Sequence, residues 1–462
     1  MQLTEYNSKK KKGQLMKDIG NRQDNKKVIS LPHGNETLEV EVPDRIIFDG
    51  AMQYIQPVNN LEELLWERIK HPVGCETLGE MVSPGEKILI LIEDNTRNTP
   101  VKKILPVLID YLKDCGIGPD NLEILAAPGT HRLMTESELN EKVGEIVASS
   151  IKISQHDFAD HAALIDLGRI RTGTGDIPIQ VNKKAIDADF IIGLGNIVPH
   201  CDAGFSGGAK IVQPGICGYP TTAATHVAAA LLEKIPLGCV ENPCRWGMEK
   251  VAKRVGLRFI INTIMNFKNE VIDIVTGDFI KAHRKGAKVA EKAFGVKIPE
   301  LADIVIVSSH PADIDYWQAE KGITSAYFTV KENGFIIFVA PCPEGLEHNH
   351  PKFREWLKMS YSGACDRVKN TSVCDETADL VSADLAIANS RAREKVTILA
   401  VSQGLEEEDF EILGYRPFKT IQTALDFALA AMPDGTIGIL PRGGDCLPVL
   451  DDTNFSHPDR LF

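Results

Sequence analysis

The fold class is decided by one stretch of sequence, ILILIEDNTRNTP at residues 88–100. Its five leading aliphatic residues predict a strand that is covered on both faces, as strands of parallel sheets are. Polar residues follow at 93–97, and after Pro100 apolar residues recur three and four apart over 101–113, which predicts a helix. A strand, a polar loop and a helix in this order form a unit of a parallel α/β sheet. In such sheets ligands collect at the carboxyl ends of the strands.

The same alternation continues along the chain. Further strand-like apolar runs, each of which adds a candidate strand, lie at 122–125, 190–192, 304–307, 335–339 and 397–401. Helical patterns lie between or after them, at 222–233, 279–293 and 420–432. We therefore expect an α/β protein of two domains, each with a mostly parallel sheet flanked by helices.

The domain boundary is predicted near Pro299, because a long helical pattern ends before it and a new strand begins after it. This places a first α/β domain at 28–297 and a second at 298–462, whose last segment can return to the first domain. A polar opening with a basic run at 9–12 is interpreted as a disordered basic tail over residues 1–27. A nucleic-acid or membrane arm is the alternative interpretation of that tail.

Composition excludes several classes of protein. The chain of 462 residues has a formal net charge of -13, whereas a nucleic-acid-binding surface needs a surplus of Lys and Arg. No apolar run approaches the roughly 20 residues that span a bilayer, so no membrane segment is expected. Ten cysteines without a C-x-x-C pair favour a protein of the reducing cytoplasm over a disulfide framework or a zinc finger.

Chemically useful residues follow the first two of the predicted strands. The segment 93–97 offers hydroxyl, amide and guanidinium groups next to a helix N-terminus, which is an arrangement that binds anions. A capped helix start with a surface arginine explains it equally well. The next strand ends in a P-G-T-H-R segment at 128–132, where His131 could act as an acid or base or have a structural role only.

The most informative segment follows the third strand, at 195–210. Its glycines allow the backbone to approach a ligand closely, and His200 and Lys210 frame the glycine-rich loop ten residues apart. Neither a Walker phosphate loop nor a G-x-G-x-x-G fingerprint is present, which argues against an NTPase and an NAD enzyme. Further on, His226 lies in a helical pattern, where it is either a metal ligand or a packing residue. Gln318 and Lys321 share one face of a later helix and suit a carboxylate, although a solvated polar face is the ordinary interpretation.

In combination, these motifs occur in the order of a known family. They are D-x-T-R at 94–97, G-T-H-R at 129–132, P-H-x-x-x-G-F-S-G-G-x-K at 199–210, the later His226, and Q-x-x-K-G at 318–322. The combination resembles the nickel-dependent lactate racemase family. The resemblance implies a nickel-pincer nucleotide, Ni(II) pyridinium-3,5-bisthiocarboxylic acid mononucleotide, covalently attached at Lys210 in the first domain. By the same resemblance His226 is the nickel ligand, and the residues that contact the cofactor are Asp94, Asn95, Thr96 and Arg97.

The resemblance also implies an activity. It makes the chain an isomerase that inverts C2 of lactate or a related 2-hydroxy acid by reversible hydride transfer, in a cleft between the domains. His131 and His200 would be the two acid/base residues, and Arg97, Gln318 and Lys321 would hold the substrate. The implied partners are the small 2-hydroxy acid and the enzymes that make and insert the cofactor, with no nucleic acid and no membrane.

The sequence departs from the family at two positions that are expected to shape the pocket. Asn98 stands where the family often has proline, and Trp317 where a tyrosine is common. Lactate is therefore not assumed, and a C2 epimerase of a longer sugar (aldonic) acid is one alternative. Two others are a non-catalytic carrier of the nucleotide and a zinc-dependent hydrolase or lyase that uses the same histidines.

Overall fold

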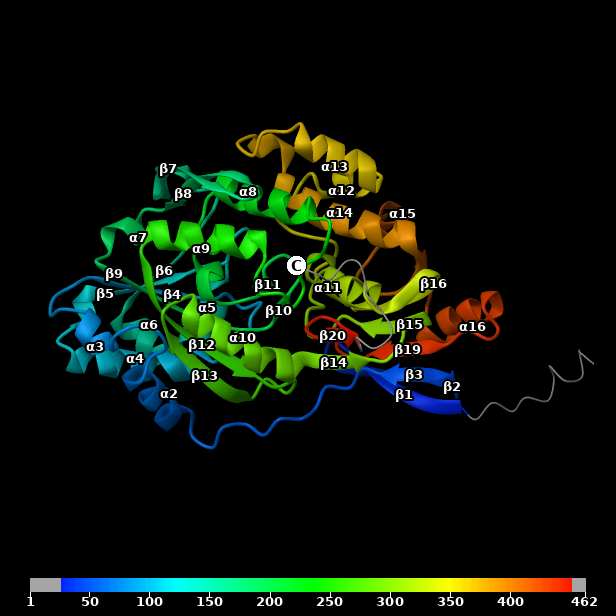
Figure 1. Cartoon of the computed structure of the whole chain (residues 1–462), viewed down its shortest axis with the longest axis horizontal. Helices are drawn as coiled ribbons and strands as arrows, with labels where there is room; N and C mark the ends of the chain where they lie inside the picture. The colour runs from blue at the N-terminus through cyan, green and yellow to red at the C-terminus, as the bar shows by residue number, and fades with distance from the viewer. Residues whose placement is uncertain (1–25, 451–462) are drawn as a thin grey trace, which may run out of the picture.

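The computed structural model describes residues 26–450, which form two six-stranded sheets (Figure 1). In spatial order, the first sheet contains β13 (Val271–Gly277), β12 (Leu257–Met265), β9 (Phe190–Asn196), β4 (Ile88–Ile92), β5 (Leu122–Ala126) and β6 (Lys152–Gln155). Its strands are parallel except for β13, which runs antiparallel to β12. The predicted α/β class with mostly parallel sheets is confirmed.

Central strand β4 shows why this sheet is covered on both faces. Ile88, Ile90 and Ile92 point into one hydrophobic core, and Leu89 and Leu91 into another, because successive side chains of a strand alternate between faces. The first core is covered by α2 (Leu61–Lys70), α4 (Val101–Asp114), α5 (Glu136–Val143) and α6 (Glu145–Ser150). The second is covered by α9 (Pro243–Val255) and α10 (Lys281–Phe294). An antiparallel pair, β7 (Leu164–Thr172) and β8 (Gly175–Asn182), packs beside α9.

The second sheet is parallel throughout. It contains β18 (Arg416–Pro417), β17 (Thr397–Val401), β16 (Val330–Val339), β15 (Ala302–Ser308), β19 (Ile437–Leu440) and β3 (Ile46–Asp49). One face is covered by α11 (Tyr316–Tyr327) and α14 (Leu380–Lys395), with α12 (Phe353–Leu357), α13 (Tyr361–Lys369) and α15 (Glu407–Leu413) around them. The other is covered by α16 (Ile421–Ala431) and the hairpin of β1 (Lys26–His33) and β2 (Glu36–Pro43).

The N-terminal strands lie with the second sheet, although the predicted first domain begins at residue 28. β3 pairs with β19, close to the other end of the chain, and the β1–β2 hairpin packs beside it (Figure 1). The alternating pattern at 38–42 predicts a half-buried strand but says nothing about which sheet it joins. The last described strand, β20 (Leu447–Leu450), pairs with β14 (Gly295–Ile298) at the junction of the two halves. Of the predicted tail, only Lys26 and Lys27 lie within the described residues, where they begin β1.

Helix α8 (Tyr219–Ala230) connects the two halves. It follows the glycine-rich segment of the first half and packs against α14 of the second half (Figure 1). Within residues 26–450, no helix combines the length and the apolar character that crossing a bilayer requires.

Candidate active site

A pocket lies where the carboxyl ends of β4, β5 and β9 meet helices α8 and α11. It encloses about 900 Å³, its open mouth included, and residues from both halves of the molecule line it. Eight of the ten residues singled out in the sequence line this pocket: Asp94, Arg97, His131, His200, Lys210, His226, Gln318 and Lys321. The other two, Asn95 and Thr96, line two neighbouring pockets. The structure thus brings together motifs that are up to 227 residues apart in sequence, from Asp94 to Lys321.

His131 is held by a carboxylate from the neighbouring strand end. Its Nδ1 lies 2.7 Å from Asp94 Oδ2, and the Thr96 hydroxyl donates to the other oxygen of the same carboxylate at 2.6 Å. Burial by itself would raise the pKa of Asp94, but His131 and Arg97 outweigh it and keep that pKa well below its usual range. The anionic carboxylate accepts a hydrogen bond from the Nδ1–H group, which leaves Nε2, 3.2 Å from the Gln318 side-chain nitrogen, as the position that can accept a proton.

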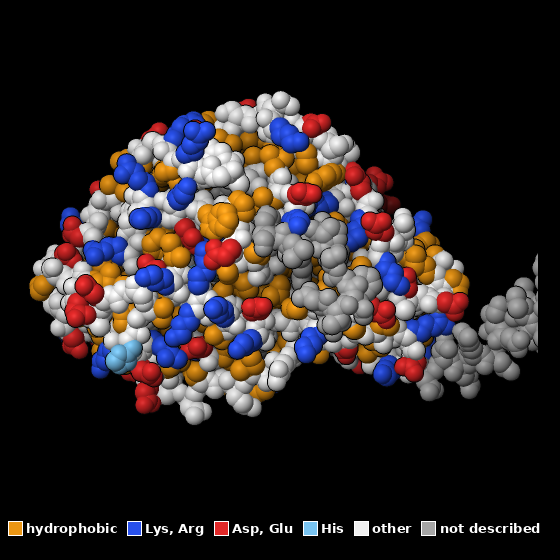
Figure 2. Space-filling model, viewed as in Figure 1, with side chains coloured by type: hydrophobic (Ala, Val, Ile, Leu, Met, Phe, Trp, Pro, Cys, Tyr) orange, Lys and Arg blue, Asp and Glu red, His pale blue; other side chains and the backbone are white. Residues whose placement is uncertain are grey.

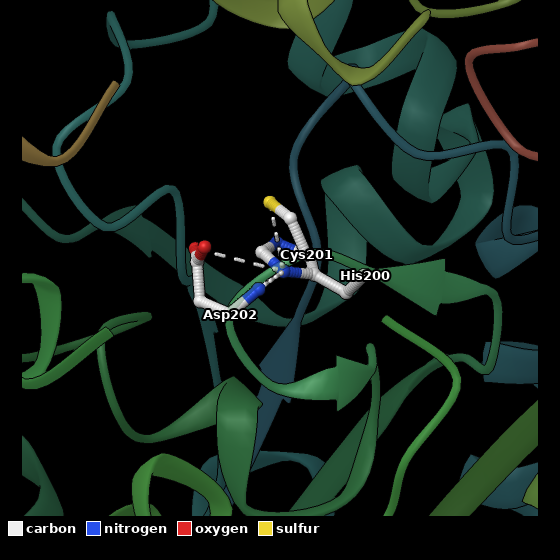
Figure 3. Close-up of side chains that lie close together, drawn as sticks. All are labelled: His200, Cys201 and Asp202. Carbon is white, nitrogen blue, oxygen red and sulfur yellow. Dashed lines mark hydrogen bonds and ion pairs between the residues drawn. The ribbon is translucent and has the colours of Figure 1, made fainter. Parts of the chain in front are cut away.

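His200 is held in the opposite way. It ends the short strand β10 (Pro199–His200), and the backbone N–H of Asp202 donates to its Nδ1 at 3.2 Å (Figure 3). The neutral ring therefore carries its proton on Nε2, where His131 has a lone pair. Burial first, and then the charges of Lys210 and Lys321, lower the pKa of His200 well below its ordinary value.

Lys210 lies in a turn whose backbone only glycine can form without strain. Gly207 precedes it with a φ of 72°, and a Cβ there would lie 2.7 Å from the carbonyl oxygen of Asn196. Within the described residues the Lys210 ammonium makes no hydrogen bond and no ion pair. Burial, followed by the charge of Arg97, lowers the pKa of Lys210 to about 8. An unprotonated amine is therefore accessible close to neutral pH.

His226 enters the pocket from α8. Its Nδ1 lies 2.8 Å from Asp384 Oδ2, on α14 of the other half, and burial lowers the pKa of His226 to about 4. Side chains that can ligate a metal gather here in two groups, whose ligand atoms lie within 4.8 Å of one another in each group. One group is His200, Cys201 and Asp202, drawn in Figure 3, and the other is Asp202, His226 and Asp384.

Three cations face the pocket: Arg97, Lys210 and Lys321. None of them forms an ion pair within the part of the chain that the structure describes. Lys321 donates to the side-chain oxygen of Gln318, and Asp315 caps the start of α11 by accepting from the Gln318 backbone at 2.8 Å. Burial, and then Arg97, lower the pKa of Lys321 to about 7. The pocket is thus suited to anions, although the net charge of the chain is negative.

Sequence reasoning missed several features in and beside this pocket. Glu320, whose pKa burial raises to about 8, lies inside the Q-x-x-K motif and could have been found there. Trp317 was noted as a departure, but its stacking on His350, with ring centroids 4.0 Å apart, was not foreseen. Asp384 lies 158 residues from His226, and no local pattern marks it.

Comparisons with known proteins agree with the motif order. The family described as "Lactate racemase N-terminal domain" matches residues 33–235, and the one described as "Lactate racemase C-terminal domain" matches residues 298–446. A lactate racemase of Thermoanaerobacterium thermosaccharolyticum is 31% identical over 341 residues, which are 72% of this chain and 78% of the relative. One of Lactiplantibacillus plantarum is 32% identical over 325 residues, which are 69% of this chain and 75% of the relative.

Two solved structures have the same fold. The lactate racemase apoprotein from Thermoanaerobacterium thermosaccharolyticum superimposes with a TM-score of 0.80 and 26% identity, over 92% of this chain and all of that one. A protein from Thermotoga maritima superimposes with a TM-score of 0.68 and 23% identity, over 86% of this chain and all of that one. The second likeness bears on the fold alone.

Proposed function

From the premise that this chain belongs to the lactate racemase family, we propose that it inverts C2 of lactate or a closely related 2-hydroxy acid. The chain is an isomerase of the racemase type. The observation that carries the proposal is the opposite hydrogen-bonding state of two histidines in one pocket. His131 presents a lone pair at Nε2, and His200 presents a proton at Nε2. An inversion needs one group to accept the hydroxyl proton and another to return a proton.

The substrate carboxylate would be held by Arg97 and Lys321, with the Gln318 amide beside them. This orientation directs the C2 hydroxyl toward His131, whose Nε2 accepts the proton while Asp94 stabilises the charged ring. His200 would return a proton from its imidazolium form, and that form would give up the proton readily, because burial and the surrounding cations lower the pKa of His200. The two histidines exchange roles when the other enantiomer is the substrate.

The pocket's residues fit the nickel-pincer nucleotide. Lys210 has a partly buried side chain, whose amine has no partner in residues 26–450, and a lowered pKa, as covalent attachment to the cofactor requires. His226 keeps Nε2 available for nickel, because its Nδ1 faces Asp384. The segment Asp94 to Arg97 would contact the rest of the group. A bound nickel-pincer nucleotide would supply a reversible hydride acceptor next to the substrate.

A longer sugar acid is the second candidate substrate, and one observation favours it. A neighbouring pocket shares Arg97, His200, Gln318 and Lys321 with the first. Five asparagines also line it: Asn95, Asn98, Asn196, Asn266 and Asn269. Side-chain amides both donate and accept hydrogen bonds and so suit a polyhydroxy chain attached to C3 of the substrate.

The test uses protein loaded with cofactor in a host that carries the biosynthetic and insertion enzymes. Single enantiomers of lactate and of several aldonic acids are incubated in deuterated buffer and analysed by chiral chromatography and proton NMR. We expect inversion with the hydrogen at C2 retained, because hydride returns to the same carbon. The proposal fails if fully nickel-loaded protein inverts none of these acids, which would favour a carrier of the nucleotide. Metal analysis of the same sample distinguishes nickel from zinc.

A further inference from the structure

The side chains of His226 and Asp384 meet across the junction of the two halves. His226 belongs to α8, which follows the glycine-rich segment, and Asp384 belongs to α14 of the second half. The distance from Nδ1 to Oδ2 is 2.8 Å, and the two side chains are only 16% and 8% exposed. Neither the family motifs nor the proposed substrate contacts assign a role to Asp384.

The chemistry of imidazole explains what such a contact does. A neutral imidazole that binds a metal through Nε2 must carry its proton on Nδ1. In a buried site, that N–H group needs an acceptor, because a buried donor without a partner destabilises the folded protein. A carboxylate acceptor fixes the tautomer, sets the orientation of the ring and makes Nε2 a better ligand. Asp384 Oδ2 occupies the acceptor position for His226.

Other contacts hold α14 against α8, so the position of Asp384 depends on how the two halves dock. The backbone N–H of Leu380 donates to the Tyr219 hydroxyl at 2.6 Å, at the start of both helices. Near the other end, Arg391 donates to the carbonyl oxygen of Leu232 at 3.0 Å. Figure 1 shows the two helices side by side. The acceptor for His226 is therefore in place only when the second half is docked on the first.

We propose that Asp384 is a positioning residue for His226. Docking of α14 on α8 then completes the metal-binding geometry of His226, which belongs to the first half of the molecule. The inference rests on the proposed function, in which His226 binds nickel. It adds the prediction that retention of nickel depends on a residue of the second half that contacts neither substrate nor reacting atoms.

The first readout needs no cofactor. Nitrogen-15-labelled histidine in the protein without cofactor reports which ring nitrogen carries the proton, and a His226→Gln variant identifies the signal. We expect the Nδ1–H tautomer in the unsubstituted protein and a shift toward Nε2–H in Asp384→Ala, where the acceptor is gone. Asp384→Asn keeps the size of the side chain and guards against a loss of folding.

The second readout is the rate at which loaded protein loses nickel to a chelator. Asp384→Asn and Asp384→Ala are expected to lose nickel about 10- to 100-fold faster, the range found when partners of metal-binding histidines are removed. The KM for the substrate should change less than about twofold, because Asp384 acts through the metal ligand. The matched control is Asp409→Asn, which also replaces a buried aspartate whose side chain contacts a basic residue, here Arg354, and which lies outside the pocket residues.

The outcomes separate this inference from the proposed function. If both Asp384 variants keep the Nδ1–H tautomer and lose nickel at the unsubstituted rate, Asp384 does not position His226. If Asp409→Asn loses nickel as fast as they do, the effect is one of general stability and the inference is wrong. Failure of the proposed function appears instead as unsubstituted, nickel-loaded protein without inversion, and the tautomer measurement remains decisive in that case.

Discussion

At the scale of single residues, burial sets the protonation states in the pocket. Lys321 and Lys210 have pKa values lowered to about 7 and about 8, and burial is the largest cause for both. Asp94 shows the opposite balance, since its contact with His131 and the charge of Arg97 outweigh burial and keep it anionic. In the same pocket, charged neighbours thus keep one group ionised, whereas burial lets others lose their charge near neutral pH.

The pKa of Lys321 predicts a pH dependence of substrate binding. Its folded-state pKa is depressed, so the cation exists below about pH 7 and is lost as the pH rises through that value. We expect kcat/KM to fall by about tenfold per pH unit on the alkaline side, because the substrate carboxylate loses a partner. Initial rates measured across neutral and alkaline pH check this. Lys321→Arg keeps its charge at every accessible pH, so the kcat/KM of this variant should not fall on the alkaline side. A fall in kcat/KM of the same size in that variant would contradict the assignment.

His131 is expected to be needed for turnover but not for retention of the cofactor. His131→Ala removes the acceptor for the hydroxyl proton and should lower kcat by about 10²- to 10⁴-fold. Nickel content and mass spectrometry of the purified variant should show the cofactor still attached. Lys210→Ala is the comparison, since it should lose covalent attachment. Full activity of His131→Ala would rule out its role as an acid or base.

At the scale of elements, the turn between β11 (Gly204–Phe205) and Lys210 decides whether the lysine reaches the pocket. Gly207 adopts a φ of 72°, and its hydrogen faces the carbonyl oxygen of Asn196 at the end of β9. This close approach fixes the backbone three residues before the predicted attachment site. Gly207 is thus explained by packing of the loop on the end of β9 as well as by ligand access.

Gly207→Ala is therefore expected to disturb attachment of the cofactor. The added Cβ would lie 2.7 Å from the Asn196 oxygen in a left-handed backbone conformation, which should destabilise the fold by about 1–3 kcal/mol and displace Lys210. Equilibrium denaturation and the mass of the loaded protein measure the two effects. Gly173→Ala is the matched control, because nothing lies within 4 Å of its Cβ position. Equal stability and equal cofactor loading of the two variants would disprove this account of the turn.

At the scale of the whole molecule, the two ends of the described chain complete the second sheet together. β3 is its edge strand beside β19, and the ring of Phe48 covers Gly438, where any Cβ would overlap the ring. Phe48 is 5% exposed. The second half of the molecule, which contributes Gln318, Lys321 and Asp384, thus depends on residues from the N-terminal segment.

Phe48→Ala should accordingly weaken the second sheet, although Phe48 lies far in sequence from the other strands of that sheet. Loss of a buried phenylalanine costs about 3–5 kcal/mol of unfolding free energy. Chemical denaturation followed by fluorescence checks the value. Ile146→Ala, at a side chain that is 82% exposed, should change it by less than about 0.5 kcal/mol. A Phe48→Ala effect as small as this control would mean that β3 contributes little to the sheet.

The sequence by itself determined the class of fold and most of the pocket. Apolar runs predicted β4, β5, β9, β15, β16 and β17, because burial on both faces leaves a continuous pattern. Because β4, β5 and β9 are parallel neighbours, the polar residues that follow them had to gather at one edge, and Asp94, His131 and His200 do so.

Only the tertiary structure decided which partners these groups have. The pairing of β3 with β19 and the contact of Asp384 with His226 join distant segments, and periodicity reports that a face is buried without reporting what covers it. The opposite tautomers of His131 and His200 depend on single hydrogen bonds, and the lowered pKa of Lys321 depends on burial by both halves. Burial and hydrogen-bond geometry exist only once the chain has packed, which is why the residue types of the site could be read from the sequence and their charge states could not.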